Sequence, residues 1–137
     1  MKIFFDNNLS PNIAHAMREL SKSEVDVEEV IHLRDRFSRR ADDIEWISAL
    51  VEDGPWIIIS IDRFKKQNDA ERAALRGAGH TVFVMDSQWA EHRYWLQAER
   101  LVRWWPQILA QARLVSASAF RVPWHHNSKS KFTVIRL

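Results

Sequence analysis

The sequence contains no cysteine and lacks the patterns that mark several familiar classes of site. Without cysteine there is no disulfide framework, no thiolate nucleophile and no cysteine-ligated metal centre. No glycine-rich phosphate loop, Ser-His-Asp order or zinc-ligand spacing is present. No apolar run approaches the roughly 18 residues that a membrane-spanning helix needs, and Met1-Lys2 leads into a strand rather than a signal peptide. We therefore expect a cytoplasmic protein with no membrane association.

The composition is that of an ordinary globular protein, but the basic residues are unevenly placed. The 137 residues fit one domain, with 46% apolar and 28% charged residues. The net charge of +2 is too small by itself to predict nucleic-acid binding. Two basic clusters lie beside acidic residues: Arg34, Arg36, Arg39 and Arg40 before Asp42, and Arg63, Lys65 and Lys66 after Asp62. Such clusters suit a polyanion held through a metal, although solvated loop charge explains most basic clusters taken alone.

Short apolar runs alternate with amphipathic segments along the chain. Residues 3–5, 56–61 and 81–85 are apolar on both faces, which is typical of buried parallel strands, and a further strand is expected within 25–33. Helices are expected at 11–20, 42–52 and 68–76, and from 89 to about 115, where Pro106 should end one helix and open the next. This alternation predicts an α/β fold with a mainly parallel sheet. The tail, Phe120–Trp124 and Lys131–Leu137, predicts an edge hairpin.

Four aspartates are expected at one edge of this sheet. Asp6, Asp62 and Asp86 each follow a buried strand, and Asp43 opens the helix that precedes the strand ending at Asp62. Open α/β folds place their chemistry at the carboxyl ends of the strands. Four carboxylates brought together repel one another unless a cation lies among them. Because all the ligands are oxygens, Mg²⁺ or Mn²⁺ is the expected ion, and such ions promote phosphodiester hydrolysis.

Each of these residues also has a purely structural explanation. A single aspartate at the end of a strand is as often a helix cap or turn residue as a ligand. Asp42 and Asp43 are ambiguous, since one is expected to cap the helix and the other to bind the metal. Asn7 and Asn8 either cap the following helix or contact substrate, and capping is favoured for Asn8.

The chain resembles PIN-like domains of the VapC-type toxin class. The resemblance lies in Phe5–Pro11, Asp43–Ile47 and Trp56–Phe64, and extends over about residues 1–115 of a single domain, with 116–137 as a C-terminal extension. It implies a three-layer α/β/α fold with strand order 3-2-1-4-5. It also implies an Mg²⁺- or Mn²⁺-dependent endoribonuclease that cuts RNA, an antitoxin encoded alongside as partner, and a possible homodimer.

Individual residues follow from this resemblance by position. Asp6 matches the first acid, Asp43 the acid on the helix, Asp62 the acid after the central strand, and Asp86 best matches the fourth. Ser60 occupies the place of a frequent Thr or Ser two residues before the central acid, where it would bind a metal-bound water or a ligand carboxylate. The expected RNA-contacting residues are Asn7, Arg39, Ser60, Arg63 and Lys65.

The seven tryptophans lie mostly in the predicted helices and strands. Trp46 and Trp56 are expected in the core, whereas Trp89, Trp95, Trp104 and Trp105 suggest a surface for a partner helix or, less favoured, for stacked bases. The main alternative function is a catalytically inactive PIN-like module that binds RNA or protein. A phosphoacceptor receiver domain fits poorly, because Asp6 lacks an adjacent acid and the last strand offers Arg136 where a lysine is needed.

Overall fold

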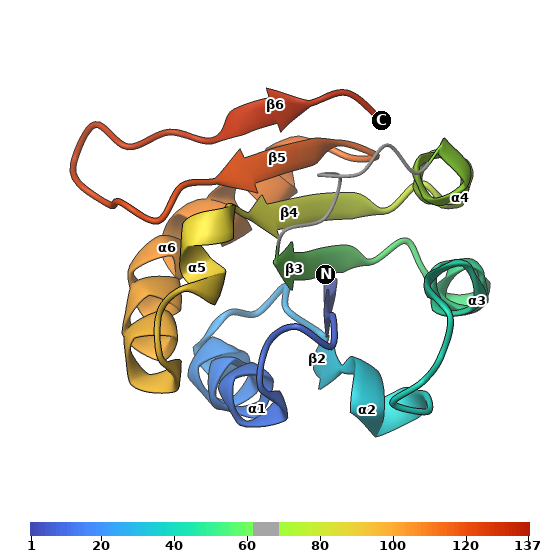
Figure 1. Ribbon diagram of the computed structural model, residues 1–137, viewed down its shortest axis with the longest axis horizontal. Coiled ribbons are helices and arrows are strands. Elements are labelled where there is room, and N and C mark those ends of the chain that lie inside the picture. Colours follow the sequence, from blue (N-terminus) through green and yellow to red (C-terminus); the bar gives the residue numbers. More distant parts are fainter. Residues whose placement is uncertain (62–68) are drawn as a thin grey trace.

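The computed structural model describes residues 1–61 and 69–137, which are organised around a six-stranded sheet. The strands are β1 (Lys2–Phe5), β2 (Glu29–His32), β3 (Ile57–Ile61), β4 (Thr81–Met85), β5 (Ala119–Val122) and β6 (Thr133–Ile135). They lie in the order β2-β1-β3-β4-β5-β6 and are parallel except for the antiparallel pair β5 and β6 (Figure 1). The predicted α/β class, the mainly parallel sheet and the C-terminal hairpin at its edge are confirmed.

Helices cover the two faces of the sheet. They are α1 (Pro11–Leu20), α2 (Leu33–Arg36), α3 (Asp43–Ala49), α4 (Asp69–Ala78), α5 (Ser87–Ala90) and α6 (Tyr94–Leu114), with short 3₁₀ helices at Ser21–Ser23 and Leu50–Asp53. The start of α1 is as the sequence predicts, because Ser10 Oγ accepts the Asn12 N–H and Pro11 takes the first helical position. Helices α1, α5 and α6 lie on one side of the molecule, and α3 and α4 on the other (Figure 1). None of the helices in the described ranges is both long and apolar enough to cross a membrane.

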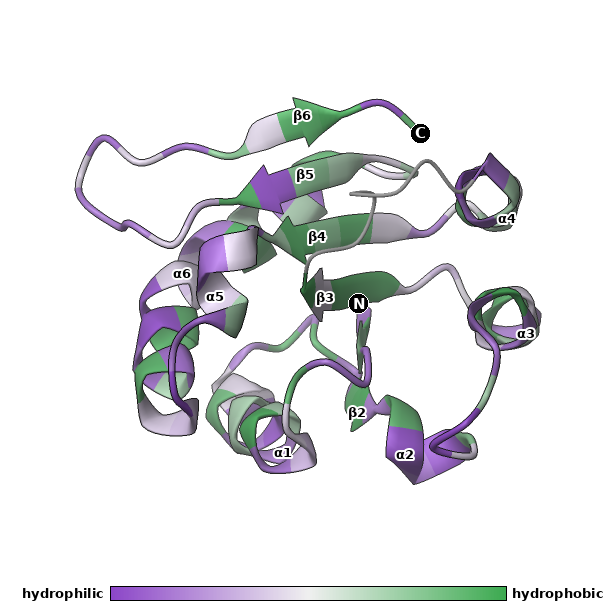
Figure 2. Cartoon of the chain, viewed as in Figure 1, coloured by the Kyte–Doolittle hydropathy of each residue, from purple (hydrophilic) through white to green (hydrophobic). Residues whose placement is uncertain are grey.

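Alternate strand residues fill two separate cores. Ile3 and Phe5 of β1 pack on the side of α1 and α6, while Phe4 between them packs on the side of α3 and α4. The same alternation continues through β3 and β4, and all of these apolar side chains are buried except Ile57, which is partly buried. Figure 2 shows these strands as largely hydrophobic and the α2 region as hydrophilic. A strand buried on both faces explains why the apolar runs are continuous rather than alternating with polar residues.

The expected strand order 3-2-1-4-5 is wrong. It places the strand 57–61 outside β2, whereas β3 pairs with β1 on one side and with β4 on the other. The physical reason is visible in the residues: β3 is apolar on both faces and needs helices above and below it, which only a central position provides. By contrast, β2 begins with the exposed Glu29, and a charged residue suits a strand at the edge.

Two local expectations about helices also need correction. The sequence predicts no helix between the strand within 25–33 and the helix at 42–52, yet the short helix α2 lies there, and His32 and Asp35 start it with a reciprocal capping box. Pro106 does not end a helix, because α6 continues through it to Leu114. Pro106 itself is exposed, while Trp105 and Ile108 beside it are buried. Burial of this apolar face outweighs the hydrogen bond that a proline removes from a helix.

Most of the tryptophans belong to the core. Trp46 and Trp56 are fully buried, as expected, and Trp46 stacks on Phe4 with ring centroids 4.8 Å apart. Trp89, Trp104 and Trp105 are also buried, so the predicted tryptophan surface for a partner helix is wrong. Of the four residues assigned to that surface only Trp95, with 80% of its area exposed, faces solvent.

His80 is a fully buried histidine that joins three elements. Its Nδ1 accepts the backbone N–H of Trp56 at 3.0 Å, and its Nε2 donates to the carbonyl of Ile47 at 3.0 Å. These partners fix the neutral tautomer with the proton on Nε2. Burial lowers the pKa of His80, since the charged form would lose its hydration, and the bond to Ile47 offsets this only in part.

We predict that stability falls when the solution is acidified below about pH 6.5, the ordinary pKa of histidine. A folded-state pKa below the unfolded value means that the unfolded chain binds the proton first, so the contribution is complete above that pH and is lost as pH falls. His80→Asn keeps the acceptor for Trp56 but cannot titrate. The free energy of unfolding, measured by urea denaturation between about pH 7.5 and 5.5, should fall less steeply with acidification in His80→Asn than in the unmodified chain. The two slopes should differ by up to about 1.4 kcal/mol per pH unit. The exposed His125 provides the control as His125→Asn; equal slopes in His80→Asn and the unmodified chain would contradict the prediction.

Candidate functional site

Asp6 lies at the carboxyl end of β1, in the middle of the parallel strands. Its backbone N–H donates to the carbonyl of Ile59 at 2.9 Å, which continues the pairing of β1 with β3 by one residue. The side chain is only 3% exposed. One carboxylate oxygen accepts the N–H of Asn7 at 2.6 Å, and the other accepts the hydroxyl of Ser60 at 2.8 Å. A carboxylate this buried needs such donors or a cation to offset its lost hydration.

Ser60 and Asn8 join the ends of the two central strands. Ser60 is fully buried in β3 and donates to the Asp6 carboxylate, which is one of the two roles that its position suggested. Asn8 does not cap α1, since Ser10 does; its side-chain N–H donates to the carbonyl of Ile61 at 3.0 Å. Both contacts tie the loop after β1 to the last residues of β3, immediately before Asp62.

Asp43 is the first residue of α3 and contacts a core tryptophan. Its Oδ1 accepts the indole N–H of Trp46 at 3.1 Å, and Trp46 stacks on Phe4 in β1. Asp42 is the N-cap residue, yet its side chain makes no capping hydrogen bond and is exposed. Of the two acids, Asp43 is therefore the one that is connected to the strand carrying Asp6.

Asp86 follows β4 and holds backbone groups with both carboxylate oxygens. Oδ1 accepts the N–H of Gln88 at 3.0 Å and caps α5, and Oδ2 accepts the N–H of Trp124 at 3.2 Å. The backbone N–H of Asp86 in turn donates to the carbonyl of Val122. These bonds fasten the end of β4 to the chain that leaves β5, which is the turn and cap role that a strand-end aspartate often has.

The remaining predicted residues, Asp62, Arg63 and Lys65, lie outside the described residues. Within 1–61 and 69–137, no three His, Asp or Glu side chains gather closely enough to hold a metal ion. The donors that are placed near Asp6 are carboxylate, hydroxyl and amide oxygens, and hard cations such as Mg²⁺ and Mn²⁺ prefer oxygen ligands. The oxygen atoms of Asp6 and Ser60 are thus of the kind that Mg²⁺ or Mn²⁺, the ion predicted from the four aspartates, prefers as ligands.

Asn7 lies between Asp6 and the arginine-rich segment. Its side-chain oxygen accepts Arg34 Nε at 2.9 Å, and its side-chain nitrogen donates to the carbonyl of Arg39 at 3.2 Å. The Arg39 side chain is exposed. Arg39, which was expected to contact RNA, therefore belongs to a loop whose backbone is fastened to the residue after Asp6.

His32 is a residue of this region that sequence reasoning missed. It is fully buried at the end of β2, where Nε2 donates to the carbonyl of Leu9 at 2.7 Å and Nδ1 accepts the N–H of Arg34 at 3.1 Å. Burial is the main cause that lowers its pKa, so the ring is neutral. The only signal in the sequence was a single histidine after the apolar pair Val30 and Ile31, which does not by itself reveal the two loops that it joins.

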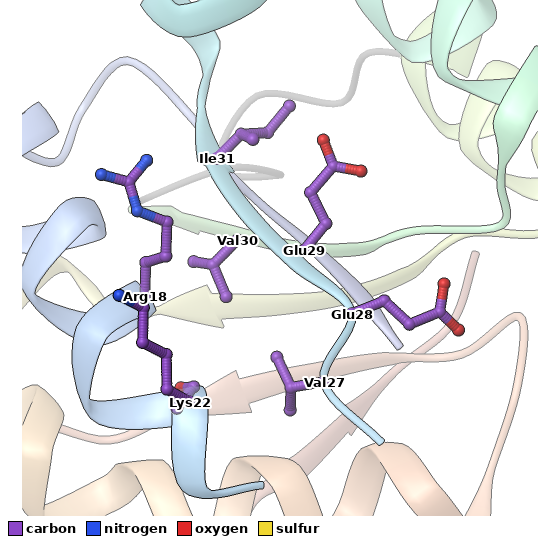
Figure 3. Close-up of a pocket in the computed structure, with 8 residues that line it drawn as sticks. Arg18, Lys22, Val27, Glu28, Glu29, Val30 and Ile31 are labelled. Atoms are coloured by element: carbon purple, nitrogen blue, oxygen red, sulfur yellow. The ribbon is translucent and has the colours of Figure 1, made fainter. Parts of the chain in front are cut away.

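A separate hollow of about 370 Å³ lies along the outer side of β2, between this strand and the end of α1 (Figure 3). Arg18 and Lys22 of the α1 region line one side of it, and Glu28 and Glu29 the other (Figure 3). None of the residues predicted for the metal or the RNA lines this hollow. It is thus distinct from the aspartate site at the carboxyl ends of the strands.

We predict that Ser60→Ala destabilises the protein, since it removes a hydrogen bond to a buried carboxylate. Bonds of this kind contribute about 1.5–3 kcal/mol, and this loss should appear in the free energy of unfolding from urea denaturation at pH 7.5. Ser48→Ala, at an exposed serine of α3, is the matched control and should change little. Equal stability of the two variants would show that the contact with Asp6 does not stabilise the fold.

Comparisons with known proteins agree with this arrangement. A family model described as a PIN like domain matches residues 1–87, which contain β1 to β4 and end one residue after Asp86. No curated protein and no solved structure matches the chain. PIN domains are typically nucleases that use divalent metal ions, so the match points to nuclease-type function in general. Since the match covers more than half of the 137 residues, the chain belongs to the PIN-like domain family.

Proposed function

We propose that this protein is an Mg²⁺- or Mn²⁺-dependent endoribonuclease that hydrolyses RNA phosphodiesters. The observation that best supports the proposal is the buried Asp6 carboxylate at the end of the central parallel strands, held by Ser60 from the neighbouring strand. Open α/β sheets bind ligands at this edge. The family match gives the general expectation of a nuclease, and the choice of RNA rests on the resemblance to the VapC-type class.

In this proposal Asp6 and Asp62 are the principal ligands of the ion, with Asp43 beside them. A divalent ion bound there supplies a Lewis acid for the phosphodiester and a source of hydroxide at neutral pH. Ser60 holds one oxygen of Asp6 in a fixed orientation, and the N–H of Asn7 holds the other. Such fixed donors reduce the reorganisation that the site needs when substrate arrives. Arg39, Arg63 and Lys65 bind the phosphates of the RNA.

Asp86 has a weaker claim to be a ligand than the other acids. Both of its carboxylate oxygens already accept backbone N–H groups. These bonds leave lone pairs for a cation, because a carboxylate offers about four acceptor positions. We propose that Asp86 acts mainly by fixing the end of β4, so that its removal affects stability more than the affinity for the ion.

The proposal predicts metal-dependent cleavage that requires Asp6 and Asp62. A labelled single-stranded RNA should be cut in Mg²⁺ or Mn²⁺ and left intact in EDTA. Asp6→Asn and Asp62→Asn should each lower the cleavage rate by about 100-fold or more, since even outer-shell changes at metal sites cost 10- to 100-fold. Asp42→Asn replaces an exposed aspartate of the same region whose side chain makes no capping bond, and should cut normally.

The other outcomes of this experiment separate the remaining functions. Cleavage that persists in EDTA would contradict the proposed dependence on metal. If no RNA is cut although Mn²⁺ binds tightly, by calorimetry, and Asp6→Asn abolishes the binding, the site is a metal site and the test RNA lacks the preferred sequence. Absence of both cleavage and metal binding would favour the catalytically inactive module that binds RNA or protein.

We further propose that the nuclease is the toxin of a type II toxin–antitoxin pair. This step rests on the resemblance in Phe5–Pro11 and Trp56–Phe64 to the VapC-type class. Induced expression of the chain without its partner should then stop the growth of a bacterial host, as measured by colony counts. Asp6→Asn, expressed at the same level, should allow growth. Normal growth with an active enzyme would indicate a nuclease with a role other than that of a toxin.

A further inference from the structure

The four arginines that follow β2 are not equivalent in the fold. Arg36 is engaged in the structure: its guanidinium lies 2.9 Å from Asp53 and stands over the rings of Phe37 and Trp56. Arg34, Arg39 and Arg40 are exposed, and no carboxylate of the described ranges 1–61 and 69–137 forms an ion pair with any of them. We refer to Arg34, Arg39 and Arg40 as the arginine surface. It carries three positive charges that the described part of the chain leaves to solvent.

The arginine surface is fastened directly to Asp6. Asn7 donates its backbone N–H to the Asp6 carboxylate, accepts Arg34 Nε with its side-chain oxygen, and donates its side-chain nitrogen to the Arg39 carbonyl. Both ends of the Asn7 amide are therefore used within the protein. Asn7 thus fixes the Arg34 side chain and the Arg39 backbone relative to Asp6.

Arg34 is held from two directions and still has donors to offer. Its backbone N–H is bound by His32, and among residues 1–61 and 69–137 its side chain is bound through Nε alone. An arginine has five N–H donors, so the two terminal nitrogens keep four of them. With Nε fixed, the planar group presents these nitrogens in one orientation, which suits the paired oxygens of a phosphate.

We propose that Asn7 is a positioning residue that aligns the arginine surface to bind the phosphodiester backbone of single-stranded RNA beside Asp6. The inference rests on the proposed ribonuclease function and adds the route by which the strand approaches the aspartates. Arg34 binds a phosphate, Arg39 and Arg40 continue the positive surface, and Asn7 acts through Arg34. Arg36 has no part in RNA binding, because its guanidinium is already used by Asp53.

The test is the salt dependence of RNA binding, measured in EDTA so that no RNA is cut. Each phosphate neutralised on a single strand contributes about 0.7 to the slope of log affinity against log salt concentration. This slope is obtained from the fluorescence anisotropy of a labelled single-stranded RNA, measured in about 50–300 mM KCl, a range in which such slopes can be determined. Arg34→Ala should lower it by about 0.7 and weaken binding. Arg76→Ala, at an exposed arginine of α4 outside the arginine surface, is the matched control and should leave the slope unchanged.

A second set of variants separates positioning from direct contact. Asn7→Ala should weaken RNA binding in the unmodified chain and have a smaller effect when combined with Arg34→Ala, where only its bond to the Arg39 backbone remains to be lost. Arg34→Lys keeps the charge, and hence the salt slope, but has no Nε for Asn7 to hold, so Asn7→Ala should also have a smaller effect in that background. Arg34→Lys serves in addition if Arg34→Ala fails to fold.

Several outcomes would overturn the inference. A slope for Arg34→Ala that equals that of Arg76→Ala would show that Arg34 binds no phosphate. Equal losses from Asn7→Ala with and without Arg34 would show that Asn7 does not act through Arg34. Undetectable RNA binding by the unmodified chain at 50 mM KCl, roughly the low end of the useful range, would also refute it. A different result would contradict the ribonuclease proposal alone: RNA binds through Arg34, but neither Mg²⁺ nor Mn²⁺ supports its cleavage.

Discussion

A carboxylate that is removed from water is costly unless hydrogen bonds or a cation replace its hydration, and the site depends on how the fold meets this cost at Asp6. Asp6 is 3% exposed at the end of a strand whose side chains are buried on both faces. The protein supplies one donor from the next residue, Asn7, and one from the neighbouring strand, Ser60. Both donors are groups that can bind a carboxylate. The fold thus places a hydrogen-bonded carboxylate where two parallel strands end.

Two buried histidines hold neighbouring segments by the same pattern of hydrogen bonds, His32 near Asp6 and His80 at the amino ends of β3 and β4. His32 and His80 are both buried and neutral, and in each the Nε2 donates to a carbonyl while Nδ1 accepts a backbone N–H. His32 joins the loop after β1 to the start of α2, and His80 joins α3 to the start of β3. A neutral imidazole can bridge two loops in this way only in one tautomer, because protonation of Nδ1 converts an acceptor into a donor. The same feature that orders the loops therefore makes their order sensitive to acid.

The sequence predicted the parts of the fold that depend on local patterns and missed those that depend on position in the sheet. Residues 3–5, 57–61 and 81–85 are strands because continuous apolar runs suit a sheet covered on both faces. The predicted order of the strands was wrong, because it was taken from the family resemblance and not from the residues. Trp104 and Trp105 were misplaced because the sequence suggested a binding surface there, whereas a helix 21 residues long can bury one face and expose the other. Trp89 is buried in the preceding short helix α5. For the site, the sequence located Asp6 and its neighbour Ser60, but it could not show that Asn8 contacts Ile61 instead of capping a helix.

The arginines after β2 differ in their partners, and these partners could not be predicted from the sequence. Arg34, Arg36 and Arg39 have the same charge and lie within six residues of one another, so composition treats them alike. In the fold, Arg36 reaches Asp53, which is 17 residues away in the chain, and its charge is neutralised there. Arg34 instead meets Asn7, an uncharged amide 27 residues away, which orients its guanidinium without reducing its charge. Whether an arginine stabilises the fold or remains available to an anion is thus decided by whether its partner carries a negative charge, and that partner is chosen by the packing of α2 against the ends of β1 and β2.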